Sequence, residues 1–461
     1  MQRRLDATHA AIAFAGLVIA LVTEDLDRSY RFDEAIYASQ FSASVDPLPW
    51  GPQRAPGMAW LVAPVTLATD SIVALRVWLG VVGAASGALA FAIWNRSVGV
   101  AAVVGHALFV ASGVVIVFST EAYPNLWLAY LALAAIGVAV GPWSSQRSVA
   151  AAVVLVALAA VFRPTEGLAV AMIVMVVVLA RRRRDGVAPA GVISMGYLVG
   201  VTPWLIRSFT SFDGPLARLD EAGERAGAGL EFRLADTVWL LDNAHGNAGT
   251  GDSLSTAVGL WFGGLVVAGG IAVARTRPWS HPVVAAVGAV IVLAAPFAVL
   301  KAHPAPRFLL PGLAPLCLAA GFGLASVLRR RAAQVLMAFA ATVLAVAQYG
   351  GYTELRDLAT FRQARLETTG QELAALADGD DCVVLTRWGR AELAFASGCA
   401  WLGPPALPAT SIEAGLHLDA AAAGDRVFAV TRSEADLPIG WIHHPFEVTA
   451  DGTTWYVSEL P

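Results

Sequence analysis

The sequence predicts a mainly α-helical, polytopic transmembrane protein with about eleven spans and a small extracytoplasmic α/β domain at its C-terminal end. Of the 461 residues, 57% are hydrophobic and 14% are charged, whereas soluble domains carry about 25% charged residues. Apolar runs long enough to cross a bilayer recur up to residue 349, and the composition then changes. These observations exclude an ordinary soluble enzyme and a disordered chain.

The apolar runs define the predicted spans. A membrane helix needs about 20 mostly apolar residues, and eleven segments are candidates: 6–23, 72–94, 98–118, 124–141, 148–162, 166–180, 188–210, 253–274, 282–300, 307–328 and 332–349. The least obvious division separates 148–162 from 166–180, because both segments are short. Arg163, Pro164 and Glu166 lie at this break, and such residues are unfavourable at the centre of a membrane helix.

The arginines predict the orientation. With the N-terminus in the cytoplasm, the inner segments hold thirteen arginines, whereas the short outer turns hold only Arg163 and Lys301 as cations. Cytoplasmic loops carry an excess of positive charge, so this multi-pass arrangement in the cytoplasmic membrane is self-consistent. Merging 148–180 into one span would place the arginine cluster 181–184 outside. The inner arginines are Arg3, Arg4, Arg96, Arg147, Arg181, Arg182, Arg183, Arg184, Arg275, Arg277, Arg329, Arg330 and Arg331.

Two domains follow from this arrangement. Residues 1–349 form the predicted transmembrane domain, whose larger outer loops are 24–71 and 211–252. Within the first loop, residues 57–69 are apolar but too short to span, which favours an interfacial or re-entrant helix. Residues 350–461 form the predicted extracytoplasmic α/β domain.

The C-terminal region alternates short apolar runs with turn residues. Cys382 and Cys399 lie there, in an oxidising compartment where cysteines can pair, although spacing alone does not fix the geometry. Cys317 lies in a span and is predicted to be a buried small residue. The predicted elements are strands at 382–385, 427–430 and 454–457 and a helix near 389–398.

The charged residues argue against two ligand classes. The net charge is −4, so the chain has no basic field for nucleic acid. Lys301 is the only lysine, and it follows Leu300. A glycine-rich phosphate loop that ends in lysine therefore cannot be written, and no nucleotide cofactor is expected by that route.

Carboxylates gather on the predicted outer face. Asp33 and Glu34 are adjacent just beyond the first span, and Glu121 lies in the turn between the third and fourth spans. Acidic residues in a first turn, or beside a proline at a helix start, are also typical of ordinary helix ends. Carboxylates at a membrane face can instead act as a general base or hold a cation.

Cations gather on the same face. They also serve as interfacial anchors of membrane helices, so each one alone is a weak indication of function. Their joint placement beside the carboxylates is more informative. The cationic residues of this face are Arg54, Arg76, Arg163, Lys301, His303 and Arg307.

The ordered motifs resemble those of the GT-C class of integral-membrane glycosyltransferases, in particular the branch of protein O-mannosyltransferases and aminoarabinose transferases. Residues 31–38 (RFDEAIYA) are similar to the D-E-x-x-Y-A signature after the first span, which includes Tyr37. Residues 54–61 (RAPGMAWL) resemble the proline-rich stretch that follows. Residues 307–311 (RFLLP) resemble a late R-Y-x-x-P element, with Phe308 in place of tyrosine. Gly57 replaces the second proline of a common pair.

The resemblance extends to single residues. Arg76 lies where the family has an arginine entering its second span, and Glu121 resembles the second acidic residue. The resemblance covers about residues 24–328, and a C-terminal domain outside the membrane is common in the class.

The resemblance implies a reaction and roles for the site residues. The donor is a sugar on a polyprenyl phosphate, and Asp33 is the general base for an extracytoplasmic acceptor hydroxyl, in a cell-envelope glycan, lipid or protein. Cations stabilise the leaving phosphate. Glu34 and Glu121 either position the acceptor or hold a divalent cation, with Asp33 a further candidate ligand, and metal use stays open. The phosphate-binding candidates are Arg307, Lys301, Arg54 and Arg163, and His303, Tyr37 and Arg76 complete the active face.

Two other functions stay open from the sequence. A transporter or flippase of lipid-linked sugar has similar hydropathy, but it usually carries internal repeats and polar residues at mid-membrane depth. Here His106 is the clearest polar residue within a span, and a helix-packing role is favoured for it. A scaffold would act through residues 350–461 alone.

Overall fold

The computed structural model describes residues 2–141, 146–225, 256–276, 282–300, 305–327, 340–348, 366–386, 390–401, 426–431, 442–444 and 456–460. This part of the chain is mainly helical, which confirms the predicted fold class. The contacts divide the chain into two compact units. Unit 1 comprises Met1–Glu24, Pro52–Met58 and Arg76–Arg356, and unit 2 comprises Asp25–Gly51, Ala59–Leu75 and Asp357–Pro461.

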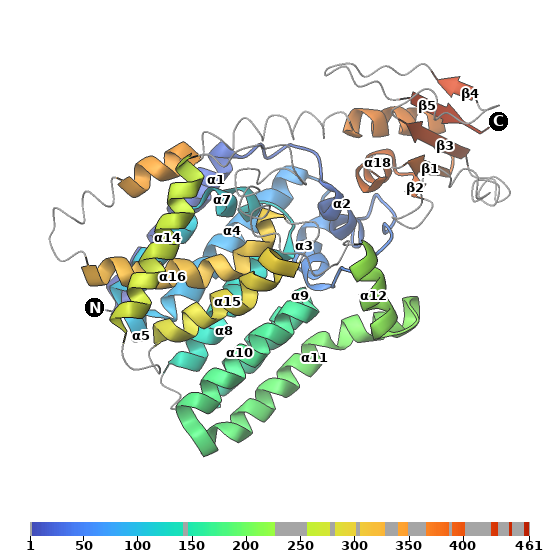
Figure 1. The fold of residues 1–461 in the computed structure, drawn as a ribbon. Coiled ribbons are helices and arrows are strands. Elements are labelled where there is room, and N and C mark those ends of the chain that lie inside the picture. The colour runs from blue at the N-terminus through green and yellow to red at the C-terminus, as the bar shows by residue number, and fades with distance from the viewer. Residues whose placement is uncertain are drawn as a thin grey trace. The chain divides into compact units, whose positions relative to one another are not determined.

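Unit 1 contains most of the long apolar helices (Figure 1). Besides the helical residues 340–348, the helices that lie in it wholly or in part are α1 (Gln2–Thr23), α3 (Gly57–Thr66), α4 (Ile72–Ala92), α5 (Asn95–Val98), α6 (Val100–Val110), α7 (Gly113–Ser119), α8 (Pro124–Val140), α9 (Gln146–Phe162), α10 (Pro164–Arg182), η1 (Arg183–Gly186), α11 (Val187–Ser211), α12 (Pro215–Arg225), α14 (Thr256–Arg275), α15 (Pro282–Leu300), η3 (Pro306–Leu309) and α16 (Leu310–Val327).

The candidate spans coincide with seven of the eleven predicted apolar runs. Among the described residues, six helices are long and apolar enough to cross a membrane, and the pair α6–α7, bent by 73°, raises the number to seven. Helices α8 and α9 have 17 residues each, which is the lower end of the spanning range. The predicted segment 332–349 is described only over 340–348, which is helical. The other ten predicted segments all contain helix.

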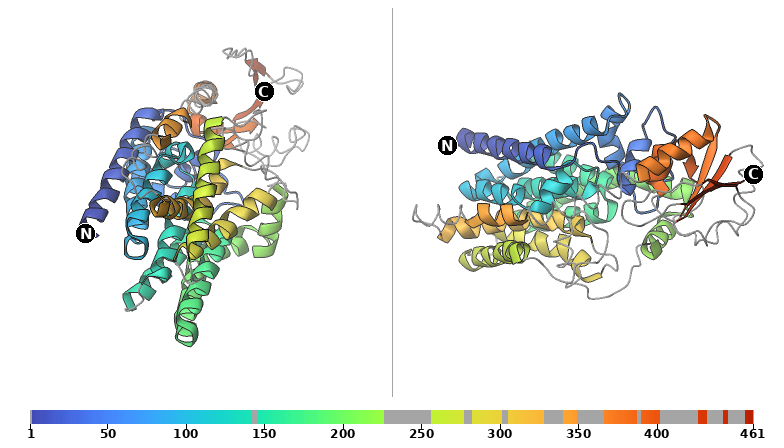
Figure 2. Two further views of the ribbon diagram at one scale, coloured as in Figure 1. Left: turned by 60° about the vertical axis from the view of Figure 1, so that its left-hand side comes forward. Right: turned by 90° about the horizontal axis from the view of Figure 1, so that it is seen from above.

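The predicted break at 163–166 is confirmed. Helix α9 ends at Phe162 and α10 begins at Pro164, where proline suits a first helical position because that N–H has no intrahelical partner. The Arg163 side chain donates to the Glu166 carboxylate at the break, with 2.8 Å from Nε to Oε1. Helices α10 and α11 then form a hairpin through η1 (Figures 1 and 2).

Helix α16 forms the centre of unit 1. Of the six long candidate spans it is the most buried, at 72% of its apolar window, and it packs against α6, α8, α14 and α15. Two glycines make this possible, because a Cβ on Gly321 would lie 2.5 Å from the Ala101 oxygen and one on Gly323 would lie 2.0 Å from the Ala268 oxygen. Small residues let membrane helices approach closely. Cys317 on this helix is fully buried, as predicted.

Unit 2 contains a mixed sheet of five described strands in the order β2-β1-β3-β5-β4. Strand β1 is parallel to β2 and β3, whereas β5 is antiparallel to β3 and β4. Helix α18 (Arg390–Ser397) connects β1 to β2, as parallel strands require a crossover. The bounds are β1 (Cys382–Thr386), β2 (Ala400–Trp401), β3 (Arg426–Thr431), β4 (Ile442–His444) and β5 (Tyr456–Glu459). The predicted α/β composition of the C-terminal region is thus confirmed.

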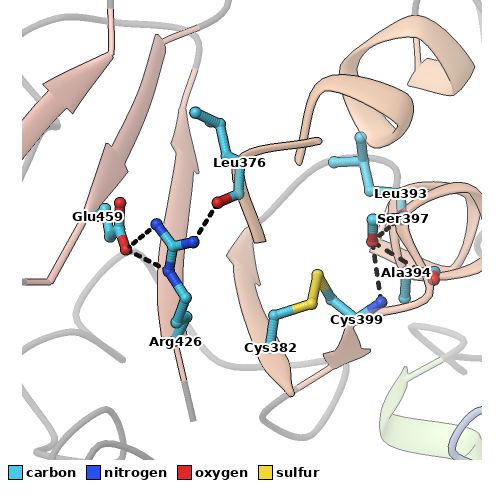
Figure 3. The surroundings of a disulfide bond; sticks show 8 residues. All are labelled: Leu376, Cys382, Leu393, Ala394, Ser397, Cys399, Arg426 and Glu459. Atoms are coloured by element: carbon cyan, nitrogen blue, oxygen red, sulfur yellow. Dashed lines mark hydrogen bonds and ion pairs between the residues drawn. A yellow bond between two sulfur atoms is a disulfide. The ribbon is translucent and has the colours of Figure 1, made fainter. Parts of the chain in front are cut away.

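A disulfide closes the β1–α18–β2 segment. Cys382 and Cys399 are bonded, with 4.7 Å between their Cα atoms (Figure 3). The Ser397 hydroxyl donates to the Leu393 carbonyl at 2.7 Å and accepts from the Cys399 backbone N–H at 3.1 Å. The end of α18 is therefore fixed by one covalent bond and two hydrogen bonds.

Candidate active site

The two adjacent carboxylates lie in the first turn of α2 (Phe32–Ser39) in unit 2. Glu34 is buried, and its Oε2 accepts the Arg31 backbone N–H at 3.1 Å, which caps the helix. Asp33 is half-buried and takes no part in that capping bond. The local structure therefore distinguishes the two residues, because the Glu34 carboxylate caps the helix and Asp33 takes no part in that bond.

Tyr37 holds the rest of α2 in place. Its side chain is buried, and its ring meets Trp50 edge-on with 5.8 Å between ring centroids. Ser39 accepts the Leu48 backbone N–H at 3.0 Å. Helix α2 is thus attached to the segment that follows it, and Tyr37 supports the helix that bears Asp33.

Glu392 on α18, also in unit 2, is a further carboxylate near Asp33 and Glu34, and it was not among the predicted site residues. Burial and the nearby charges of Asp33 and Glu34 raise the pKa of Glu392 to about 7. The signal in the sequence was weak: Glu392 is the only acid in an otherwise apolar stretch that includes Leu393 and Ala394. Its proximity to Asp33 depends on a contact between segments far apart in the chain.

In unit 1, two of the predicted phosphate-binding arginines share one aromatic residue. The Arg307 guanidinium lies 4.7 Å from the Tyr123 ring centroid and 5.1 Å from that of Phe308, and the Arg163 guanidinium lies 5.9 Å from Phe308. Phe308 itself stacks on Phe297 at 5.3 Å. Cations over ring faces are held by the ring quadrupole, so the apolar Phe308 positions both guanidinium groups without a tyrosine hydroxyl.

Glu121 lies in the turn that leads to Tyr123. Its side chain is 1% exposed, and its carbonyl accepts the Tyr123 backbone N–H at 2.9 Å. Tyr123, which follows this turn, carries the ring that Arg307 contacts, and the Phe308 ring is contacted by both Arg307 and Arg163.

Arg54 is held through its backbone by a residue outside the predicted site. Arg218 on α12 is fully buried and donates to the carbonyls of Pro52 at 3.0 Å, Arg54 at 2.7 Å and Trp204 at 3.0 Å, and to the Ser208 hydroxyl at 3.2 Å. Burial and the charge of Arg207 lower its pKa to about 10, which leaves the guanidinium charged at neutral pH. The guanidinium also lies 4.6 Å from the centroid of the Trp204 ring.

One of the three remaining predicted residues lies in the described part of the chain and two do not. Arg76 on α4 is buried at 1% exposure. Lys301 and His303 lie outside the described residues. Over the ranges that the structure describes, no group of three or more His, Cys, Asp or Glu side chains is arranged to hold a metal ion.

The fold is that of solved GT-C glycosyltransferases. ArnT from Cupriavidus metallidurans bound to undecaprenyl phosphate matches with a TM-score of 0.67 at 14% identity, over 97% of each chain. The apo oligosaccharyltransferase of Archaeoglobus fulgidus matches with a TM-score of 0.53 at 14% identity, over 97% of this chain and 74% of its own. The arabinofuranosyltransferase AftD from Mycobacteria matches with a TM-score of 0.54 at 16% identity, over 99% of this chain and 40% of its own.

The chain therefore has the fold of the GT-C class, and the predicted resemblance is confirmed at the level of fold. No protein-family model and no curated sequence matches the chain.

Proposed function

We propose that this protein is an inverting glycosyltransferase that moves a sugar from a polyprenyl-phosphate donor to an extracytoplasmic acceptor. The observation that carries the proposal is the match, over 97% of both chains, to an ArnT structure that binds undecaprenyl phosphate. The buried Glu121 turn and the Arg163–Arg307 pair support it, because they combine a carboxylate with cations suited to a phosphate. The acceptor class is a cell-envelope glycan, lipid or protein.

Asp33 is the proposed general base. Its carboxylate takes the proton of the acceptor hydroxyl while the hydroxyl oxygen bonds to the anomeric carbon. The bond from that carbon to the phosphate oxygen breaks, and the lipid phosphate leaves with the electron pair. Because attack and departure are on opposite faces, the anomeric configuration inverts.

Arginines are the proposed ligands of the leaving phosphate. A guanidinium fork matches phosphate oxygens and stabilises the charge that develops on them. Arg307 and Arg163 are favoured by their shared ring contacts, and Arg54, Lys301 and His303 complete the proposed set. Glu34 and Glu121 position the acceptor, and a divalent cation would supply further charge stabilisation to the phosphate where one binds.

We also propose that the protein lies in the cytoplasmic membrane with residues 350–461 as an extracytoplasmic domain. The Cys382–Cys399 bond supports this orientation, because disulfides persist in oxidising compartments. The orientation is tested by introducing a cysteine at position 372 and treating intact cells with a membrane-impermeant maleimide. Labelling of intact cells is expected, and labelling only after lysis would contradict the proposed orientation.

The reaction is tested with purified protein in lipid nanodiscs, a panel of labelled polyprenyl-phosphate sugars and a membrane acceptor extract. Asp33→Asn is expected to lower kcat at least about a hundredfold, as loss of a general base does. Asp46→Asn is the matched control, because Asp46 is an exposed acid in the same loop. Equal transfer by wild type and Asp33→Asn would refute the base assignment.

The stereochemistry of the product tests the mechanism separately. NMR of the product is expected to show an anomeric configuration opposite to that of the donor. Retention would overturn the single displacement. If folded wild-type protein transfers no sugar from any donor but moves the donor across the bilayer in a flipping assay, the flippase alternative replaces the transferase.

A further inference from the structure

A contact within unit 2 joins the helix that bears Asp33 to the C-terminal region. Helix α18 packs against α2. Tyr30, just before α2, meets Phe395 of α18 edge-on with 4.7 Å between ring centroids. The Ser29 hydroxyl also donates to the Glu367 carboxylate, 338 residues away in the chain. The start of α2 is therefore built partly from residues of the C-terminal region.

Glu392 completes the cap of α2. It lies on α18 where that helix packs against α2, and backbone hydrogen bonds from its own N–H and from that of Phe32, the first residue of α2, lower the pKa of its carboxylate. The preceding N–H, of Arg31, is taken by Glu34. The first N–H groups of a helix have no intrahelical partner, and carboxylates satisfy them well. Two carboxylates thus hold the two N–H groups that precede Asp33, one from α2 itself and one from α18.

Helix α18 is itself firmly held. The Cys382–Cys399 disulfide joins its C-terminal end to the first residue of β1 (Figure 3). Leu393 and Ala394 are fully buried. Glu392 therefore comes from a rigid element rather than from a loop that adapts to α2. Glu392 Oε2 is buried and makes no hydrogen bond to the described residues, and the backbone N–H groups of Glu392 itself and of Phe32 are the two that bond to its carboxylate.

We propose that Glu392 is a positioning residue for Asp33, because it fixes the first turn of α2 through the Phe32 N–H while the disulfide fixes α18. This inference rests on the proposed function, in which Asp33 is the base. Glu392 acts through the helix and does not touch the substrate. The C-terminal region thereby contributes to the chemical step, in addition to any acceptor that it binds.

The first test is hydrogen–deuterium exchange of residues 25–39 in full-length protein in nanodiscs, which requires no substrate. Glu392→Ala removes the acceptor and is expected to speed exchange of the α2 amides at least tenfold. Glu392→Gln keeps a carbonyl oxygen and is expected to exchange as wild type does. Glu372→Ala is the control, because Glu372 is an exposed acid of the same unit. Equal exchange in wild type and Glu392→Ala would overturn the proposed contact.

The second test is transfer, with the donor that wild type uses. Glu392→Ala is expected to lower kcat by about tenfold to a hundredfold, as misplaced catalytic groups do, with the donor KM changed less than twofold. Glu392→Gln is expected to restore most of the activity. A normal kcat in Glu392→Ala, or equal losses in the Ala and Gln variants, would overturn the positioning role.

The two tests separate the inference from the proposed function. If wild type transfers no sugar, the proposed function fails while the exchange result still decides whether Glu392 holds α2. If wild type transfers and Asp33→Asn does not, the function stands and the Glu392 variants decide the inference alone. Should Glu392→Ala not accumulate, Glu392→Asp serves instead, because it keeps the charge but shortens the reach to Phe32. Its faster exchange and lower kcat would support the proposal, and wild-type values would overturn it.

Discussion

Replacement of Arg218 by methionine is expected to destabilise unit 1 strongly. Arg218 is fully buried and donates four hydrogen bonds, two of them to the carbonyls of Pro52 and Arg54, which lie outside any helix. Loss of the guanidinium leaves these two carbonyls without their donor, at about 1–3 kcal/mol each. The sum is about 4 kcal/mol, which agrees with the cost of breaking a buried charged network.

The assay uses the buried thiol of the same unit. Cys317 is fully buried and is the only cysteine outside the disulfide, so a thiol-reactive dye reports its exposure as the protein unfolds on heating. A loss of about 4 kcal/mol is expected to lower the midpoint by roughly 10 °C. The Arg218→Lys variant keeps the charge but loses the forked guanidinium group. Its midpoint is expected to fall by about half as much.

The control for this experiment is Arg147→Met, because Arg147 is an exposed arginine of the same unit. Its midpoint is expected to stay within about 2 °C of wild type, as surface substitutions usually do. If Arg218→Met unfolds at the same midpoint temperature as the control, the hydrogen bonds to Pro52 and Arg54 do not stabilise the segment that contains these two residues. That result would refute the reasoning.

Three other predictions concern separate parts of the chain. Gly57→Ala is expected to cost about 1–3 kcal/mol in the same thiol assay, because its Cβ would lie 2.8 Å from the Phe162 Cα; an unchanged midpoint would contradict this. The double variant Cys382→Ser, Cys399→Ser is expected to lower the stability of unit 2 by about 3 kcal/mol, measured by calorimetry against wild type with and without reductant. Glu392 binds its proton more tightly in the folded state, with a pKa of about 7 against 4.5 ordinarily. Stability should therefore rise by up to roughly 3 kcal/mol as the pH falls from about 7 to 4.5, and calorimetry of Glu392→Gln should lose this dependence.

The sequence predicted the helical framework well because the bilayer imposes a long and simple pattern. The break at Arg163 and Pro164 followed from the cost of charge and proline in a membrane helix, and α9 and α10 end and begin there. The role of Gly57 was not predictable, because it depends on the close approach of Phe162. At this position, where the family pattern has a proline, the Phe162 backbone lies close to where a side chain would begin.

The residues of the candidate site could be proposed from the sequence, but the contacts that hold them in place could not. The adjacent acids Asp33 and Glu34 were found together, but only the capping bond from Arg31 distinguishes them. The partners of the site, Arg218 and Glu392, carry no local signal, because each acts through a backbone group that is distant in sequence. Periodicity and spacing describe neighbours along the chain, and these contacts join residues more than 150 positions apart.

The contact between Ser29 and Glu367 has a consequence for the order in which the protein is made. The two residues are 338 positions apart, so a ribosome adding about 5–20 residues per second needs roughly 17–70 s to pass from one to the other. During that time α2 has emerged, but α18, which caps it, has not been made. A nascent chain, or one truncated before α18, therefore carries Asp33 without its support. Assembly of the complete α2 turn thus has to wait until synthesis is almost finished.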